Sequence, residues 1–166
     1  KIGYTSNFTI YDDADSKSLI KAIVKDMGLN DKVYKPSVVA SRISMAKNHL
    51  VLPDGYAYDS SFQKRDVETH MLDMTKLYAA YCDRCRRANA MDFDDLLVNT
   101  FLLLRDHPET RRKYASLFRY ILVDEYQDSN EVQECIFEAV SKNGQNRFLV
   151  GDVKQSIYRF RLADPG

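Results

Sequence analysis

Apolar positions between residues 8 and 90 recur every three or four residues, a spacing that predicts helices joined by short connections. Asp15 or Ser16 can cap the first helix, and Gly28 stands where a glycine commonly ends one. Pro36 suits the first turn of a second helix, because proline lacks the N–H that a first turn leaves unbonded. The apolar stripe expected to bury the first helix comprises Leu19, Ile20, Ile23 and Val24.

A third and longest helix is predicted from Gln63 to Ala90, after a turn at Asp54-Gly55. Basic and acidic residues are interspersed on its polar faces, which favours an ordinary solvated surface. The run Arg84-Cys-Arg-Arg87 carries no acidic residue and is a candidate phosphate contact. The apolar residues of this helix alternate steps of four and three, as in a heptad seam: Val67, Met71, Met74, Tyr78, Tyr81 and Cys85.

From Met91 onward the pattern becomes that of an α/β unit. Asp92 can cap a helix that ends before His107-Pro108, and Pro108 opens another that ends near Phe118. Two apolar runs of strand length, 120–123 and 147–150, flank a helix predicted over residues 130–141. A strand, a helix and a second strand in this order favour a parallel pair. The predicted fold class is therefore α-rich α/β, with a helical part over 1–90 and an α/β part over 91–166.

Two adjacent carboxylates, Asp124 and Glu125, directly follow the first of these strands. Open α/β sheets bind ligands beyond the carboxyl ends of their strands. An Asp at that place can hold a water-clad Mg²⁺, while a neighbouring Glu orients or deprotonates an attacking water. A merely solvated strand end is the alternative, but Gln127 and Asp128 beside the carboxylates favour a site. Asp128 could also cap the helix that follows.

Two segments closely resemble motifs II and III of the superfamily 1 DNA helicases of the UvrD, Rep and PcrA type. They are Val123-Asp-Glu-Tyr-Gln-Asp128 and Val150-Gly-Asp-Val-Lys-Gln-Ser-Ile-Tyr-Arg-Phe-Arg161. Three upstream segments are similar to those by which that family enters, crosses and leaves its inserted 1B subdomain: Asn7-Phe-Thr-Ile-Tyr-Asp12, Ile43-Ser-Met-Ala-Lys-Asn48 and Met91-Asp-Phe-Asp-Asp-Leu-Leu97. The resemblance implies a helical 1B subdomain over 1–90, joined to part of a RecA-like parallel α/β motor domain over 91–166.

The resemblance also implies a role for three polar residues in the use of ATP and Mg²⁺. It assigns Mg²⁺ coordination to Asp124 and activation of the hydrolytic water to Glu125. Gln155 becomes the sensor of the γ-phosphate, since an amide can donate to a phosphate oxygen and accept from water. An ordinary loop amide is the alternative for Gln155.

Aromatic and basic residues alternate at Tyr158, Phe160 and Arg161, which is typical of a platform for single-stranded DNA. A core aromatic is the alternative for Tyr158, and for Phe160 the resemblance to a base-stacking aromatic favours function. Many relatives have a Gly-Ala pair where this chain has Leu162-Ala163, and residues 151–164 are close to those of AddA-type helicase-nuclease subunits. The subfamily therefore stays open at this point.

The resemblance implies an ATP-dependent 3′-to-5′ helicase that acts on single-stranded and duplex DNA in repair or recombination. No G-x-x-x-x-G-K-[ST] occurs in the sequence, so the loop that cradles the β- and γ-phosphates is missing. We expect a fragment that starts after the first helicase motifs, ends just past motif III, and is inactive without the remaining helicase domains. A non-enzymatic DNA-binding or protein-interaction module is the alternative.

Composition adds few constraints. The 24 basic residues balance the 24 acidic ones, so any attraction for DNA must come from local patches. No apolar run reaches the roughly 20 residues needed to cross a bilayer, and no signal peptide precedes the first helix, which predicts a cytoplasmic protein. Cys82 and Cys85 form a C-x-x-C within a predicted helix, without a second Cys or His pair at zinc spacing. We expect them to be reduced, structural thiols.

Overall fold

The structure is a computed structural model that describes residues 2–142 and 144–151. The chain divides into two compact units, one over Gly3–Leu96 and one from Leu97 onward. Each unit is mostly helical and contains one two-stranded parallel sheet, which confirms the α-rich α/β fold class. None of the helices in the described ranges is long and apolar enough to span a membrane.

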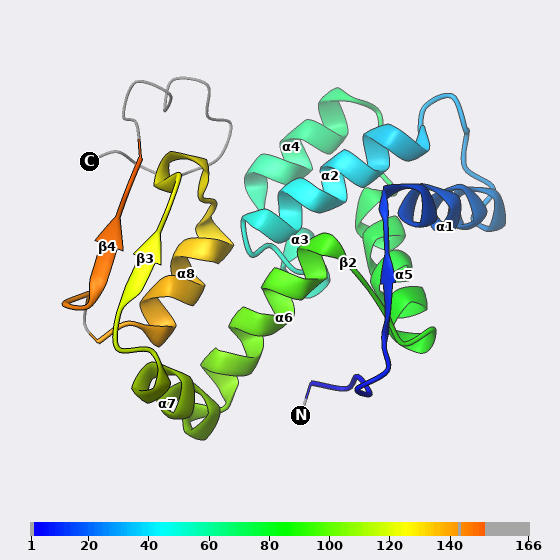
Figure 1. The fold of residues 1–166 in the computed structure, drawn as a ribbon. Coiled ribbons are helices and arrows are strands. Elements are labelled where there is room, and N and C mark those ends of the chain that lie inside the picture. Colours follow the sequence, from blue (N-terminus) through cyan, green and yellow to red (C-terminus); the bar gives the residue numbers. More distant parts are fainter. Residues whose placement is uncertain (1, 143, 152–166) are drawn as a thin grey trace. The chain divides into compact units, whose positions relative to one another are not determined.

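The first unit contains five helices and a strand pair (Figure 1). The elements are β1 (Thr9–Tyr11), α1 (Asp13–Asp26), α2 (Pro36–Asn48), α3 (Pro53–Tyr56), α4 (Ser60–Glu68), α5 (Met74–Arg87) and β2 (Ala90–Asp92). β1 and β2 pair in parallel, with Ile10 opposite Met91. β1 lies within residues 8–90, where only helices were predicted, and β2 starts at Ala90, the predicted end of the third helix. Neither strand was predicted, and the helix before β2 ends at Arg87 rather than at Ala90.

Helix starts follow local signals, with one shift in position. Asp12, rather than Asp15 or Ser16, is the N-cap of α1, and Asp12 and Asp15 bond each other's backbone N–H groups in a capping box. Pro36 is the first residue of α2, as predicted. Asp54 and Gly55 lie in the single turn of α3 rather than in an open turn.

The predicted long helix is interrupted between Glu68 and Met74. The N–H of Met71 donates to the carbonyl of Asp66 and that of His70 to the carbonyl of Val67, which is a Schellman ending with His70 at φ 56°. Because the chain turns there, Met71 is buried in the core, whereas Val67 is 61% exposed. The predicted seam is therefore correct from Met71 to Cys85 and wrong at Val67.

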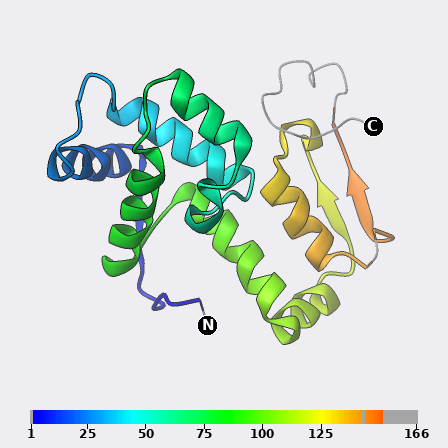
Figure 2. The same cartoon turned by 180° about the vertical axis from the view of Figure 1, so that it is seen from behind.

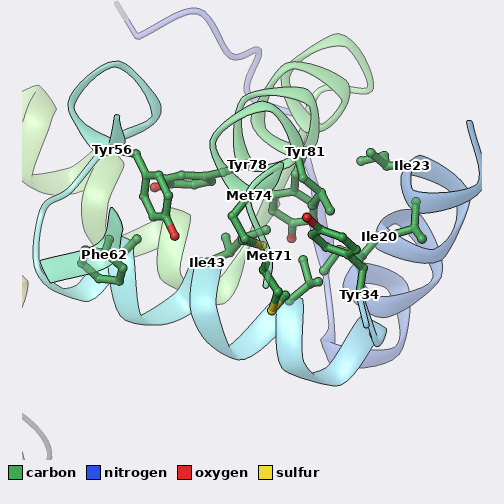
Figure 3. Packing of buried hydrophobic residues seen from close by; sticks show 14 of the residues in the cluster. Ile20, Ile23, Tyr34, Ile43, Tyr56, Phe62, Met71, Met74, Tyr78 and Tyr81 are labelled. Atoms are coloured by element: carbon green, nitrogen blue, oxygen red, sulfur yellow. The ribbon is translucent and has the colours of Figure 1, made fainter. Parts of the chain in front are cut away.

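The core of the first unit lies among α1, α2, α3, α4 and α5 (Figure 3). Ile20, Ile43 and Met74 are buried there beside a group of tyrosines. Each buried tyrosine hydroxyl has a polar partner, as the interior requires. The hydroxyl of Tyr78 donates to the carbonyl of Val51 at 2.9 Å.

The second unit begins within α6 (Phe93–Asp106), whose start lies in the first unit. It continues through α7 (Pro108–Leu117), β3 (Ile121–Val123), the 3-10 turn η1 (Tyr126–Asp128), α8 (Glu131–Val140) and β4 (Arg147–Leu149). These helices and strands confirm the predicted order. Figures 1 and 2 show α8 beside β3 from opposite sides. Leu122 and Phe148, which pair in register, are both exposed, so this sheet has an open apolar face.

Candidate nucleotide site

The carboxyl ends of β3 and β4 lie side by side, because the two strands are parallel and in register from Ile121 opposite Arg147 to Val123 opposite Leu149. The pairing continues past both strands. The N–H of Val150 donates to the carbonyl of Val123, and the N–H of Tyr126 donates to the carbonyl of Val150, each at 2.8 Å. The segment after β3 is therefore held against the end of β4.

Asp124 and Glu125 are exposed at this edge, where the sequence placed them. The backbone N–H of Glu125 donates to Oδ1 of Asp124 at 2.8 Å. Glu125 adopts the left-handed conformation, with φ 45° and ψ 45°. A residue with a Cβ loses roughly 1–2 kcal/mol in that conformation, and such strain clusters at functional sites.

A short 3-10 turn fixes the residues after Glu125. The N–H of Asp128 donates to the carbonyl of Glu125 at 2.8 Å, and Gln127 is buried, 6% exposed. Asn130, not Asp128, is the N-cap of α8: its side chain accepts from the N–H of Gln133 in a capping box. The predicted capping role of Asp128 was therefore wrong.

The opposite ends of the strands are tied by Asn146, which is buried. Its amide nitrogen donates to the carbonyls of Phe118 and Arg119, and its amide oxygen accepts from the N–H of Lys142. The N–H of Ile121 donates to the Asn146 carbonyl at 2.9 Å. One side chain thus holds both strands at the edge away from the carboxylates.

A polar cluster on the same unit links the carboxylate loop to α8. Arg147 donates to the carboxylate of Glu134 at 2.5 Å. Burial raises the pKa of the Tyr126 hydroxyl, and a hydrogen bond with Glu134 raises it further. The hydroxyl of Tyr126, the residue after Glu125, is therefore bonded to the Glu134 carboxylate of this ion pair.

The first unit contains a buried ionic cluster that the sequence patterns did not reveal. Lys47 is 1% exposed, and its ammonium lies 2.7 Å from Oδ2 of Asp92 and 2.8 Å from Oδ1 of Asp95. The Tyr81 hydroxyl donates to Asp92 at 2.8 Å. Burial alone would lower the pKa of Lys47, but the carboxylates of Asp95 and Asp92 outweigh it and hold that pKa well above its usual value.

The two carboxylates of this cluster are held by Lys47 and by the start of α6, and burial raises the pKa of Asp95. Burial opposes ionisation of Asp92, but Lys47 outweighs it and lowers the pKa of that carboxyl. Asp92 and Asp95 also bond each other's backbone N–H groups, and so cap α6 as predicted for Asp92. Lys47 belongs to the segment Ile43–Asn48, which resembles part of the helicase family. The sequence does not distinguish it from a surface lysine; its burial in the fold does.

The C-x-x-C cysteines and the run of arginines lie on α5. Cys82 and Cys85 are free thiols, and no group of three or more His, Cys, Asp or Glu able to hold a metal occurs in the described ranges. Arg84 pairs with Asp26 at 2.6 Å, and Arg87 pairs with Asp83 at 2.9 Å. Two of the arginines considered for phosphate contact therefore form exposed ion pairs with acidic side chains.

The comparison with known proteins decides the family. The model of the UvrD/REP helicase N-terminal domain matches residues 1–166, the whole chain. The chain belongs to this helicase family. Two curated relatives are named ATP-dependent DNA helicase PcrA, one from Leuconostoc citreum and one from Staphylococcus aureus strain Mu50.

The identities are spread over nearly all of the chain. The Leuconostoc citreum PcrA is 36% identical over 165 residues, 98% of this chain and 21% of the relative. The Staphylococcus aureus PcrA is 37% identical over 164 residues, 99% of this chain and 22% of the relative. The chain thus spans about a fifth of the length of these helicases.

Four residues assigned from the resemblance to this helicase family lie outside the described residues. They are Gln155, Tyr158, Phe160 and Arg161. Their roles stay predictions. Asp124 and Glu125 are the two assigned residues whose geometry the structure provides.

Proposed function

We propose that this chain carries the Mg²⁺-binding and water-activating carboxylates of an ATP-dependent 3′-to-5′ DNA helicase. The observation that supports it most is the position of Asp124 and Glu125 at the carboxyl end of a parallel strand, in a chain that belongs throughout to a helicase family. The proposed substrates are single-stranded and duplex DNA, in repair or recombination within the cytoplasm.

The residues present at the strand ends fit Mg²⁺ and a nucleoside triphosphate. Mg²⁺ keeps most of its waters and takes one or two carboxylates together with phosphate oxygens, so a single Asp suffices on the protein side. Bound Mg²⁺ and ATP supply the transferable phosphoryl group and neutralise its charge. Asp124 would hold the hydrated cation, and Glu125 would orient the attacking water and accept its proton.

The domain assignment is part of the proposal. Residues 1–90 correspond to a 1B subdomain, and residues 91–166 correspond to part of a RecA-like motor domain. The exposed pair Leu122 and Phe148 supports this, because an open apolar sheet face of this kind is usually covered by further strands or helices. We propose that the remaining helicase domains of a longer protein provide that cover, as well as the missing phosphate-binding loop.

The DNA-binding role is proposed for Tyr158, Phe160 and Arg161, and the γ-phosphate contact for Gln155. Without the phosphate-binding loop, the 166-residue chain alone should not hydrolyse ATP. The phosphates would meet the Asp124 and Glu125 carboxylates without the lysine and backbone N–H groups that normally offset their charge.

The test uses a full-length protein of this family that carries this sequence. Glu125→Gln keeps the shape of the side chain but removes the base, so DNA-stimulated ATP hydrolysis should fall about 10²-fold or more with nucleotide affinity nearly unchanged. Glu138→Gln, at an exposed position of α8, is the matched control and should hydrolyse ATP normally. Turnover of Glu125→Gln within a few-fold of wild type would remove Glu125 from this role. A wild type that binds DNA without hydrolysing ATP would favour a non-enzymatic module.

A further inference from the structure

Gly151 lies directly beyond the backbone contact between the two strand ends. The N–H of Val150 donates to Val123, and the carbonyl of Val150 accepts from Tyr126. These two hydrogen bonds restrict the backbone of the residues that follow Val150 and Tyr126. Gly151 comes next on the β4 side, and Gln127 comes next on the β3 side. The two residues meet there.

The absence of a side chain at Gly151 is a steric requirement. A Cβ built on Gly151 would lie 2.3 Å from Oε1 of Gln127, 3.1 Å from the Gln127 nitrogen and 3.2 Å from the Tyr126 nitrogen. Gly28 and Gly144, in contrast, have positive φ and open space around the same position. Glycine is needed at 151 for close approach and at those two positions for backbone conformation.

Gln127 has little room to retreat from a larger residue. Its side chain is buried, and Ser129 and Asn130 just beyond it are buried as well. A methyl group at position 151 would therefore displace the Gln127 side chain and press against the backbone nitrogens of residues 126 and 127, which would have to move by a few tenths of an ångström. Glu125, in its strained left-handed conformation, is the adjacent residue and would move with them.

We propose that the contact between Gly151 and Gln127 positions Glu125 for its reaction with water. The role of Glu125 in this proposal rests on the proposed function, whereas the contact between Gly151 and Gln127 does not depend on it. Gln127 and Gly151 are positioning residues: they act through the backbone of Tyr126 rather than on the substrate. A small displacement of Glu125 matters, because general base catalysis depends on the hydrogen-bond geometry between the base and the attacking water.

The first experiment measures the contact without any activity, by amide hydrogen exchange on the 166-residue chain. Gly151→Ala should speed exchange of the Tyr126 amide about tenfold or more, because its bond to Val150 is strained or lost. Gly151→Ala combined with Gln127→Ala removes the closest clash, and exchange should return to within about threefold of the Gln127→Ala chain. Gly55→Ala, where a Cβ meets nothing within 4 Å, is the control and should leave Tyr126 unchanged.

The double variant keeps the test decisive even if Gly151→Ala does not fold. If Gly151→Ala unfolds the second unit and the double variant restores it, the contact is confirmed. If Gly151→Ala exchanges like wild type, or if the double variant is as perturbed as Gly151→Ala, the proposal is wrong.

The second experiment measures the consequence in the full-length protein. Gly151→Ala should lower kcat for ATP hydrolysis about tenfold or more with KM within about threefold, and Gln127→Ala should restore part of that loss in the double variant. Equal losses in Gly151→Ala and the double variant would overturn the positioning role. If wild type shows no hydrolysis, the proposed function fails, while hydrogen exchange still decides whether the contact exists.

Discussion

The N–H of Glu125 bonds the carboxylate of Asp124 while Glu125 itself is left-handed. The first carboxylate is therefore held by the peptide group that joins the two residues. The left-handed conformation of Glu125 then sets the direction in which its own side chain and the following 3-10 turn leave that peptide group. Since glycine adopts positive φ without penalty and glutamate does not, the left-handed conformation of Glu125 is maintained at a cost in stability.

The strain at Glu125 predicts an inverted order of two substitutions. In the 166-residue chain, Glu125→Gly should be about 1 kcal/mol more stable than Glu125→Ala, because only the alanine carries the left-handed penalty. At Glu138, inside α8, the order should reverse by about 1 kcal/mol, because glycine is a poor helix former. Urea unfolding of the four variants measures both differences. The same order at both positions would show that Glu125 is not left-handed in solution.

The buried cation of Lys47 predicts a large loss on its removal. Lys47→Met leaves Asp92 and Asp95 close together without a counter-charge, which should cost about 3–5 kcal/mol of unfolding free energy at pH 7. The control is Lys64→Met. Lys64 forms an exposed pair with Glu68 at 3.9 Å, and its loss should cost less than about 0.5 kcal/mol. Equal effects of the two substitutions would contradict the burial of Lys47.

The same cluster predicts how this loss depends on pH. The pKa of Asp92 is lowered in the folded chain, so its contribution to stability is complete above its unfolded pKa of about 4 and is lost as the pH falls further. In Lys47→Met the unpaired carboxylates should have raised pKa values, and protonation should then stabilise the variant. The difference between wild type and Lys47→Met should therefore shrink from pH 7 to pH 4. A difference that grows on acidification would show that the carboxylates are not the groups involved.

The cysteines predict selective labelling. Burial raises the pKa of both Cys82 and Cys85 to about 12, so only about one thiol in 10⁴ is ionised at pH 8. Cys135 lies in the other unit and, unlike Cys85, is only partly buried; burial raises its pKa as well, but by less. In a short pulse of iodoacetamide followed by peptide mass spectrometry, Cys135 should be modified first. Labelling of Cys82 and Cys85 should occur only as the first unit unfolds. Cys135→Ser should abolish the early phase of labelling. Equally fast labelling of Cys82 and Cys135 in the folded chain would contradict this packing.

The sequence by itself determined the features that depend on neighbouring residues. Pro36 starts a helix, Gly28 follows the end of one, and Asp92 caps another, because each effect involves only a few adjacent backbone groups. The location of Asp124 and Glu125 at the end of a strand was also predictable, because an apolar run followed by carboxylates is visible in the sequence.

Only the tertiary structure decided the features in which distant residues meet. The turn after α4 has no glycine, and His70 takes the left-handed conformation there. The next residue, Met71, is buried in a core built from distant segments. Lys47 and Asp92 are 45 positions apart, and no periodicity links them. The same holds for Gly151, which in the sequence is only one residue of the segment that resembles motif III and in the fold is the residue against which Gln127 lies. Local propensity reaches a few residues along the chain, whereas close approach and charge pairing depend on which segments the fold brings together.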